Sequence, residues 1–581
     1  MVWSFQGNSA LKRVAVPIAL GAAFFFSSAV VASAAPTSAA SISNAATGSN
    51  YFQPGINRGV GFCKKLQNGT LHASAGANGY CFGPQQNGRA GNAAIFGGLP
   101  AVTEYGNVDA ANPQEDIAPN GTVAYGQSEV STAAVGNDVM EAWNDSTGFF
   151  AACPSPGNKE ELTGFGFSTN GGRSFTDGGG LPNRQCAFRR LDGDPSVEAW
   201  APGGLATFYV SSIYAGAAII NDIAINACQA IGTSVSCGEP VIAASSQDCF
   251  GTSFCGFLDK EFMSIDPVRK KLYISYTEFG VSSTTFDNIE LAVCDISSPM
   301  HPVCNPGYHA VKTGPYLVVH QTPPTSCAEN EGAYPAVDVK TGDVYVAYEH
   351  NWASNFSCQE QVGEVLSYIP HSCLVSGSHS PCGGSGRPIA STFQPIVSID
   401  SAFIPGYNRF PMNDFPRIAV SNPYNTVSVV WNDGRYHPYG DILMQSYNLK
   451  SMNGVQGTPV VVNSNTSGWK FLPAVRNPNA QGHLNVSFYS RDRGDTAITD
   501  VMAALSLSPR ATTTNPNVRI TTDASDWNAV SSDIVPNFGD YTDNYVRATS
   551  TAPWTNTDLY IAWSDGRIGD PQPYNAATNT H

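Results

Sequence analysis

Residues 415–444 read FPRIAV-SNPYN-TVSVVW-NDGR-YHPYG-DILM. The runs 415–420 and 426–431 are rich in β-branched and aromatic residues, and the five residues between them are of the kinds that favour turns. The stretch therefore predicts a β-hairpin. A polar turn at 432–435 follows the hairpin, and residues 441–444 begin a third strand.

The same pattern returns in six other units along the chain. Their first strands begin near Glu129, Asp194, Glu261, Tyr334, Leu472 and Asp540, and their second strands end near Trp143, Ser211, Tyr276, Tyr348, Tyr489 and Trp563. Strand-built repeats spaced by roughly 55 to 85 residues are typical of a propeller in which each repeat forms one antiparallel blade. We predict an all-β fold, a β-propeller of four-stranded antiparallel blades. The hairpin count gives seven blades, and six is the alternative.

The N-terminal region has a different composition. Basic residues at Lys12 and Arg13 precede an apolar run at 14–31, and a small-residue site follows at Ala34 and Ala35. This order predicts a secretory signal peptide. An uncleaved membrane anchor is the alternative, because the run is nearly long enough to span a bilayer. We assign residues 1–35 to the signal peptide, 36–114 to a flexible linker and N-terminal extension that contains Cys63 and Cys81, and 115–581 to the propeller.

The charge of the chain limits its partners. The formal net charge is −16, whereas binding to nucleic acid or to an anionic membrane surface requires a basic patch. Only 13% of residues are charged, and 56 Gly with 24 Tyr fit a turn-rich secreted β protein. We expect an extracellular monomer that binds neither nucleic acid nor, once the signal is cleaved, a membrane.

Fourteen cysteines fall into pairs of near neighbours: Cys63/Cys81, Cys153/Cys186, Cys228/Cys237, Cys249/Cys255, Cys294/Cys304, Cys327/Cys358 and Cys373/Cys382. An even count behind a signal peptide predicts disulfides, and none of the pairs has the spacing of a zinc site. The pairs at 228/237, 294/304 and 373/382 each follow a hairpin at the same place in their unit. We expect each of these three to tie the third strand of a blade to the fourth.

Residues 168–175 carry a resemblance to a known family. They read STNGGRSF and resemble the Asp box, Ser-x-Asp-x-Gly-x-Thr-Trp, of bacterial neuraminidase repeats, with Asn170 in place of the Asp and Phe175 in place of the Trp. Together with the recurring Trp-x-Asp-Gly-Arg and Gly-Asp-Tyr segments, this makes residues 115–570 similar to the sialidase-like superfamily. The resemblance implies that the Asp box lies between the third and fourth strands of a blade.

The resemblance also implies where a functional site should lie. In such propellers the first strand of each blade lines the central channel, and the start of that strand shares one face with the loop between strands two and three. The predicted starts form one column: Glu129, Asp194, Glu261, Tyr334, Phe415, Leu472 and Asp540. The four carboxylates of this column fall in the contiguous blades seven, one, two and three. Arginines come from the other side: Arg417, Arg435, Arg493 and Arg567.

Such a two-sided funnel fits glycoside hydrolysis. That reaction needs an acid and a base or nucleophile beside one bond, and arginines bind a sugar carboxylate through paired hydrogen bonds. The resemblance implies a secreted sialidase-like exo-glycosidase acting on sialic-acid-type or other acidic glycans, with a glycan or glycoprotein as partner. The catalytic candidates are Asp540, Tyr541, Glu261, Asp194 and Glu129, with Tyr541 as nucleophile by its place in the last blade. The substrate-binding candidates are Arg417, Arg435, Arg493 and Arg567.

Other interpretations remain open. The same funnel would serve a non-catalytic propeller that binds glycan or protein, and the Arg-Ile-Pro tripeptide of catalytic sialidases has no counterpart here. In Trp-x-Asp-Gly-Arg, the Asp can cap its own turn and the Arg can pair with a nearby carboxylate. The acidic column could hold backbone amides, water or a structural Ca²⁺. The ten histidines show no metal-ligand spacing, so no cofactor beyond such a Ca²⁺ is expected.

Overall fold

In the computed structural model, all described residues belong to one compact unit, Ala46–His581. The structure describes residues 60–580 except 70, 86–95, 98–100, 113–115, 119–120, 152–160, 217–220, 247–255, 281–286, 306–314, 322–328, 353–360, 376–387, 401, 495 and 549–557. The predicted signal peptide and the linker at 37–50 lie outside these residues. Within them, no helix is long and apolar enough to cross a membrane.

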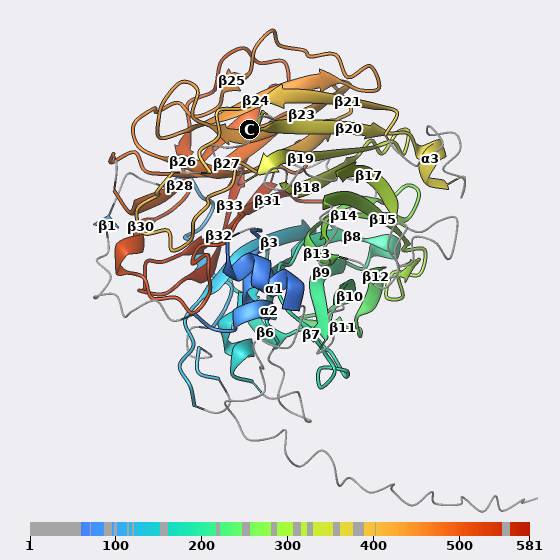
Figure 1. The fold of residues 1–581 in the computed structure, drawn as a ribbon, viewed down its shortest axis with the longest axis vertical. Coiled ribbons are helices and arrows are strands. Elements are labelled where there is room, and N and C mark those ends of the chain that lie inside the picture. The colour runs from blue at the N-terminus through green and yellow to red at the C-terminus, as the bar shows by residue number, and fades with distance from the viewer. Residues whose placement is uncertain are drawn as a thin grey trace, which may run out of the picture. The chain divides into compact units, whose positions relative to one another are not determined.

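The described strands form seven antiparallel sheets, which are the blades of a β-propeller (Figure 1). The first four blades contain β3 (Gln127–Val135), β4 (Asp138–Asp145), β5 (Thr163–Ser168) and β6 (Thr176–Gly180); β7 (Arg189–Leu191), β8 (Val197–Trp200), β9 (Thr207–Gly216), β10 (Asn221–Ile231), β11 (Ser234–Cys237) and β12 (Val241–Ser245); β13 (Phe257–Asp266), β14 (Lys271–Phe279), β15 (Asp287–Asp295), β16 (Val303–Cys304) and β17 (Tyr316–Gln321); and β18 (Glu329–Val337), β19 (Val344–Trp352), β20 (Gly363–Ile369) and β21 (Ala390–Pro395).

The last three blades contain β22 (Arg417–Ser421), β23 (Thr426–Asp433), β24 (Asp441–Asn448) and β25 (Val460–Val461); β26 (Lys470–Ala474), β27 (Leu484–Ser490), β28 (Ile498–Leu507), β29 (Val518–Arg519) and β30 (Asp523–Asp526); and β31 (Asp543–Val546), β32 (Asp558–Asp565) and β33 (Gln572–Asn579). Both the all-β class and the seven-blade count are thus confirmed. The few described helices include α1 (Val60–Gln67), α2 (Ala75–Phe82) and α3 (His371–Val375).

The N-terminal extension closes the ring. Strand β2 (Val108–Asp109) pairs with β33 as the outer strand of blade seven, and β1 (Phe96–Gly97) pairs with β30 in blade six. On the inner side, β3 of blade one packs against β31 and β32 of blade seven. The propeller therefore begins before the predicted boundary at residue 115, because two short strands of the extension complete the last blades. Strands of two residues carry too little pattern to be recognised in the sequence.

Apolar side chains between neighbouring blades form the core. Trp143, Trp431 and Trp563, each near the end of a second strand, are at most 1% exposed. Their burial explains why an aromatic residue recurs at this position in the repeats, since indole rings fill much volume between packed sheets. These tryptophans belong to the core of the protein and not to an exposed sugar-binding surface.

Three of the predicted disulfides are present among the described residues. Cys228–Cys237 joins β10 to β11 and Cys294–Cys304 joins β15 to β16, so each ties the third strand of a blade to the fourth as predicted. Cys63–Cys81 links α1 to α2. Cys186 and Cys373 are also disulfide-bonded. The other member of each remaining predicted pair, and both cysteines of two pairs, lie outside the described residues.

The Asp-box turn lies where the resemblance places it, between β5 and β6 of blade one. The Asn170 side chain accepts a hydrogen bond from the Ser174 backbone N–H at 3.1 Å, and the Ser168 hydroxyl accepts one from the Gly172 N–H at 2.9 Å. Asn170 therefore closes the turn with its side-chain oxygen, as an aspartate would.

Buried carboxyl groups make the stability of this fold depend on pH. Burial raises the pKa of Asp116 to about 8, although Gln127 and Gln572 donate hydrogen bonds to its two oxygens at 2.7 and 2.8 Å. Burial likewise raises the pKa of Glu198 to about 7, against the opposing effect of Arg476. A carboxyl pKa that is higher in the folded chain than in the unfolded chain stabilises the fold below the unfolded pKa. That stabilisation is lost as the pH rises through the folded pKa.

We therefore expect the free energy of unfolding to fall between pH 4 and pH 8, by up to about 1.4 kcal/mol per pH unit for each such group. Urea titrations across this range measure the slope. Asp116→Asn should make the slope shallower. Glu239→Gln, at an exposed carboxylate paired with Arg184, is the matched control and should leave the slope unchanged. A flat profile for the unmodified protein would contradict this prediction.

Candidate active site at the channel mouth

The first strands of the blades are distorted where they enter the channel. In the described chain, six blades have a residue with positive φ at this point: Glu129 (+56°), Asp194 (+57°), Lys260 (+55°), Gly332 (+66°), Leu472 (+47°) and Gly539 (+78°). The strand pairing shifts register there in β3, β13, β18 and β26. A non-glycine residue in this conformation costs about 1 to 2 kcal/mol, and a bulge re-aims the side chain that it carries. The recurring strain marks this end of the channel as a candidate functional site.

The bulges also correct the predicted column. Glu129 and Asp194 have a positive φ in blades one and two. The residue with a positive φ is Lys260 in blade three and Gly539 in blade seven, so these two are the structural counterparts of Glu129 and Asp194. Glu261 and Asp540 therefore stand one position later in their blades than Glu129 does in its own. A bulge adds one residue to one strand, and no fixed residue type marks its position, so the repeat pattern did not reveal the offset.

Lys260 lies at the centre of a cluster of carboxylates. Its Nζ atom is 3.0 Å from Glu129 Oε1, 2.6 Å from Asp540 Oδ2 and 4.0 Å from Asp194 Oδ2. All four side chains are fully buried, and they come from blades three, one, seven and two. Among the described residues, no three His, Cys, Asp or Glu side chains are arranged to hold a metal ion. The Lys260 ammonium lies between the carboxyl groups of Glu129 and Asp540.

Asp540 is held by a second cation. Arg409, from the long connection between blades four and five, donates to Asp540 through both terminal nitrogens, with Nη1 3.0 Å from Oδ2. The Tyr407 hydroxyl and the Asn413 amide each donate to Oδ1 at 3.2 Å. Burial opposes ionisation of Asp540, but Arg409 and Lys260 outweigh it and lower the pKa of this carboxyl to about 2. Asp540 is therefore a carboxylate at any ordinary pH.

Glu129 has the opposite tendency. Burial and the neighbouring Asp194 raise the pKa of Glu129 well above its usual value, although Lys260 opposes them. Asn144 links the two carboxyls, because its Nδ2 atom donates to Glu129 Oε2 at 2.9 Å and its Oδ1 atom accepts from the Asp194 N–H at 2.6 Å. The mouth thus places a carboxyl that favours its neutral form beside Asp540, which stays ionised.

Two further predicted residues, Tyr541 and Arg417, are buried beside this cluster. The Tyr541 hydroxyl donates to the Pro195 carbonyl oxygen at 2.8 Å, and burial raises the pKa of Tyr541 well above 10. Arg417 lies among aromatic rings, with Cζ 4.4 Å from the ring centre of Phe262 and 4.8 Å from that of Tyr334. In the structure as described, no carboxylate bonds to the Tyr541 hydroxyl, which is the partner that a tyrosine nucleophile requires.

The remaining arginines do not join the cluster. Arg435 pairs with Asp433 of its own turn at 2.6 Å, and Trp431 Nε1 donates to the same carboxylate at 3.0 Å. Blade seven repeats the arrangement: Arg567 and Trp563 bond to Asp565 at 2.6 and 2.7 Å. In both segments the Arg pairs with the Asp of its own turn, as in the structural interpretation above, and each Arg also bonds to a neighbouring segment, Arg435 to the Pro395 carbonyl oxygen and Arg567 to Asn107. Arg493 is exposed.

The structure therefore brings together Glu129, Asp194 and Asp540, with Glu261 also buried nearby, where its pKa is raised by burial and by Asp194. Sequence reasoning missed Lys260, Arg409 and Asn144. Lys260 was visible as the charged residue between Asp259 and Glu261 at the start of a repeat. Arg409 had no such signal, because it lies in a connection between blades that carries no repeat pattern.

Comparisons with known proteins concern the fold alone. No protein-family model matches the chain, and no curated protein sequence does. Among solved structures, the chain is similar to an α-L-arabinofuranosidase from Fusarium graminearum in complex with an iminosugar inhibitor, at 10% identity and a TM-score of 0.40, covering 82% of this chain and 98% of that one. It is also similar to a Hadza microbial sialidase (11% identity, TM-score 0.36, 68% and 66% covered) and to the sialidase of Trypanosoma rangeli (9%, 0.33, 69% and 58%). At such scores these similarities assign no substrate and no catalytic residue to this chain.

The Lys260 cluster gives a direct prediction. Lys260→Met leaves Glu129, Asp194 and Asp540 buried without the ammonium between them, and loss of one partner of a buried ion pair costs about 3 to 5 kcal/mol. Urea unfolding at pH 7 should show a loss of that size. Lys271→Met is the matched control, since Lys271 pairs with Asp295 at 2.8 Å on the surface, where such a pair contributes about 1 kcal/mol or less. Equal losses in the two variants would contradict the central role of Lys260.

Proposed function

We propose that this chain is a secreted glycoside hydrolase whose reacting groups are Glu129 and Asp540 at the channel mouth. The observation that carries the proposal is the convergence of these two carboxyls on one Lys260 ammonium. Two carboxyls with opposite protonation preferences, set side by side, are the arrangement that acid-assisted glycoside cleavage requires.

The spacing of the two groups favours a retaining mechanism. Glu129 Oε1 and Asp540 Oδ2 lie 3.0 and 2.6 Å from the same Nζ atom. These oxygens must therefore be closer than the roughly 6.5 Å that is the minimum for inverting enzymes. In this proposal Glu129 protonates the glycosidic oxygen and Asp540 attacks the anomeric carbon. Glu129 then takes a proton from the water that releases the sugar.

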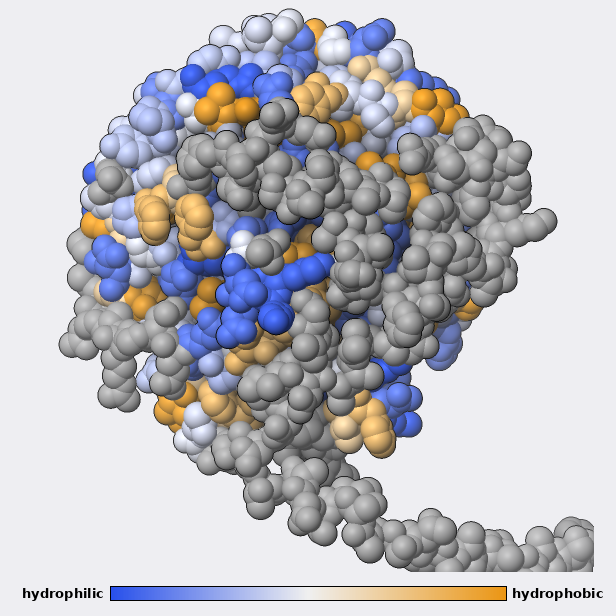
Figure 2. Space-filling view, in the orientation of Figure 1, coloured by the Kyte–Doolittle hydropathy of each residue, from blue (hydrophilic) through white to orange (hydrophobic). Residues whose placement is uncertain are grey.

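The setting of the site supports a glycan or glycoprotein as partner. Figure 2 shows hydrophilic residues near the middle of the face that carries α1 and α2, with apolar residues in small scattered groups over its described part. The disulfides among the described residues and the predicted signal peptide support secretion. In keeping with the sequence analysis, we propose a monomer that binds neither nucleic acid nor membrane. The acidic glycans that the resemblance implies are tested beside neutral ones, with Arg417 as the candidate arginine for an acidic ligand.

A non-catalytic glycan- or protein-binding propeller is the second candidate. The observation that favours it is the complete burial of Glu129, Lys260 and Asp540, each of which is at most 1% exposed. Groups that are sealed and internally paired can serve purely to hold the blades together. Tyr541, without a carboxylate partner in the described structure, also fits this candidate better than a sialidase-type nucleophile.

A panel of fluorogenic glycosides tests the proposal. It should contain an α-sialoside and a glucuronide as acidic substrates, and an α-L-arabinofuranoside and a β-galactoside as neutral ones. Glu129→Gln and Asp540→Asn should each lower kcat by about 100-fold or more, as expected for loss of an acid or a nucleophile. Glu239→Gln should retain full activity, and melting temperatures identify any variant that has unfolded. Turnover that survives both substitutions would overturn the assignment, and binding on a glycan array without turnover of any glycoside would favour the second candidate.

A further inference from the structure

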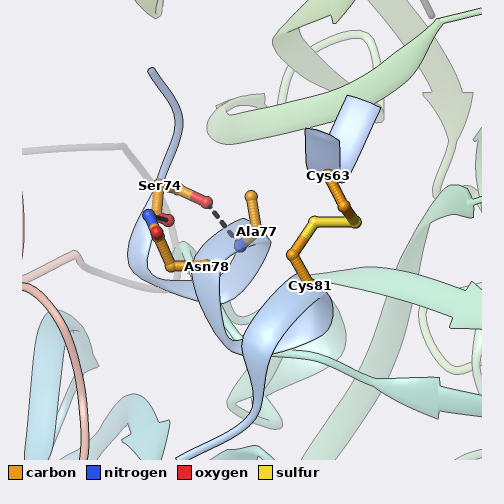
Figure 3. Close-up of a disulfide and its surroundings, with 5 residues drawn as sticks. All are labelled: Cys63, Ser74, Ala77, Asn78 and Cys81. Atoms are coloured by element: carbon orange, nitrogen blue, oxygen red, sulfur yellow. Dashed lines mark hydrogen bonds between the residues drawn. A yellow bond between two sulfur atoms is a disulfide. The ribbon is translucent and has the colours of Figure 1, made fainter. Parts of the chain in front are cut away.

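A small segment of the chain covers the channel mouth. Helices α1 and α2 are joined by the Cys63–Cys81 disulfide, and the Ser74 hydroxyl accepts a hydrogen bond from the Ala77 N–H at 2.9 Å to cap α2 (Figure 3). Figure 1 shows both helices in front of the inner strands, near the centre of the ring. The segment belongs to the extension and not to any blade.

The first turn of α2 bonds directly to the carboxylates of the mouth. The Ser74 N–H and hydroxyl donate to Asp259 at 2.9 and 2.5 Å, and the Gly76 N–H donates to Asp194 Oδ1 at 2.8 Å. The Ala75 N–H lies 3.5 Å from Glu129 Oε1. Every one of these contacts is a donor from the segment to an acceptor of the propeller. The first turn of a helix carries unpaired N–H groups and partial positive charge, so it suits an acidic site.

The segment is seated closely against the blades. The Phe62 ring stacks on Phe257 of β13 at 4.1 Å between ring centres. A Cβ atom on Gly76 would lie 2.6 Å from both the Asp192 backbone oxygen and Asp194 Oδ1, and one on Gly79 would lie 3.0 Å from the Phe149 ring. The two glycines therefore allow α2 to enter where no larger residue would fit.

The mouth has acceptors that the segment leaves unused. Glu261 and Glu331 are at most 1% exposed, and in the described structure neither carboxyl oxygen of either residue has a hydrogen-bond partner. Both interact electrostatically with Asp259 and Lys260. A buried polar group without a partner is costly, so these acceptors point to a ligand that offers more donors than α2 does.

We propose that the turn at residues 73–76 stands in for a neutral or amino sugar in the mouth, and that such a sugar binds only when the α1–α2 segment has left. Hydroxyl or ammonium hydrogens would then replace the N–H groups of Ser74, Ala75 and Gly76 on Asp259, Glu129 and Asp194. This inference rests on the proposed function, whose reacting groups lie in the same mouth. It deepens that function by naming the substrate class.

The charge around the seat disfavours an acidic sugar. Asp194, Asp259, Glu261 and Glu331 all lie there beside Glu129 and Asp540. Asp540 is ionised, so a ligand carboxylate would face its negative charge. Of the mouth's two cations, Lys260 and Arg409, both are already paired with Asp540. The Arg417 guanidinium lies against the rings of Phe262, Tyr334 and Tyr541. The Lys260 Nζ atom lies 5.4 Å from the centre of the Tyr541 ring. A ligand carboxylate would therefore be buried beside ionised Asp540 while both Lys260 and Arg409 are already paired, and a buried charge without a partner is costly.

Two variants release the segment by different means. Gly76→Val places methyl groups against Asp194 and the Asp192 carbonyl, and Cys63→Ser with Cys81→Ser removes the link between the helices. Gly69→Asn is the matched control, because Gly69 has a φ of +65° that Asn tolerates and no heavy atom within 4 Å of its added Cβ. Hydrogen exchange of residues 60–85 reports release. Calorimetric titration with galactose, glucosamine and glucuronate reports binding to the whole protein.

We expect faster exchange in both released variants, at least tenfold tighter binding of galactose or glucosamine than in the wild type, and no gain for glucuronate. Gly69→Asn should match the wild type. The inference is overturned if neither variant releases the segment, if release brings no gain in binding, or if glucuronate alone gains. Hydrolysis is read separately: sugar binding without turnover by a released variant rejects the proposed function and leaves the inference standing. Equal turnover by the wild type and released variants rejects the inference alone.

Discussion

The ion pairs of Lys260 with Glu129 and Asp540 are the interactions on which the centre of this propeller depends. A ring of blades brings the inner ends of its strands together, and here four neighbouring blades each contribute acidic residues at that point. Carboxylates that are buried close together repel one another strongly, because little solvent screens them. The Lys260 ammonium of blade three pairs with Glu129 of blade one and Asp540 of blade seven, and it offsets this repulsion. Arg409 supplies the second positive charge from outside the repeats.

The parts of the fold that arise from neighbouring residues were predictable from the sequence. These parts are the hairpins, the Asp-box turn and the disulfides Cys228–Cys237 and Cys294–Cys304. Each lies within a short stretch, where turn chemistry and strand pattern decide the structure. The short strands β1 and β2 were not predictable, because a strand of two residues is too short to show the alternation of apolar and polar side chains. Their pairing depends on blades that come hundreds of residues later.

The candidate site was only half predictable, for a related reason. The acidic column identified Glu129, Asp194 and Asp540, since the starts of the first strands all lie at the channel even where a bulge shifts one of them by a residue. The arginines were ambiguous, because an Arg two residues after an Asp can serve a ligand or its own turn. Arg435 and Arg567 each pair with the Asp two residues before them. The local backbone already holds that Asp within reach, so no further ordering of the chain is needed to form the pair. The role of Lys260 follows from a bulge, which no residue pattern announces.

The closure of the ring by β2 has a consequence for how the molecule comes into being. Asn107, beside β2, accepts a hydrogen bond from Arg567, 460 residues later in the chain. Asn107 and β2 are synthesised before the propeller blades, but their partners in blade seven are made only after the other six blades. Contacts between such distant parts slow folding, since the chain must first bring its ends together. Until blade seven has been synthesised, β2 has no strand to pair with and the ring of blades cannot close.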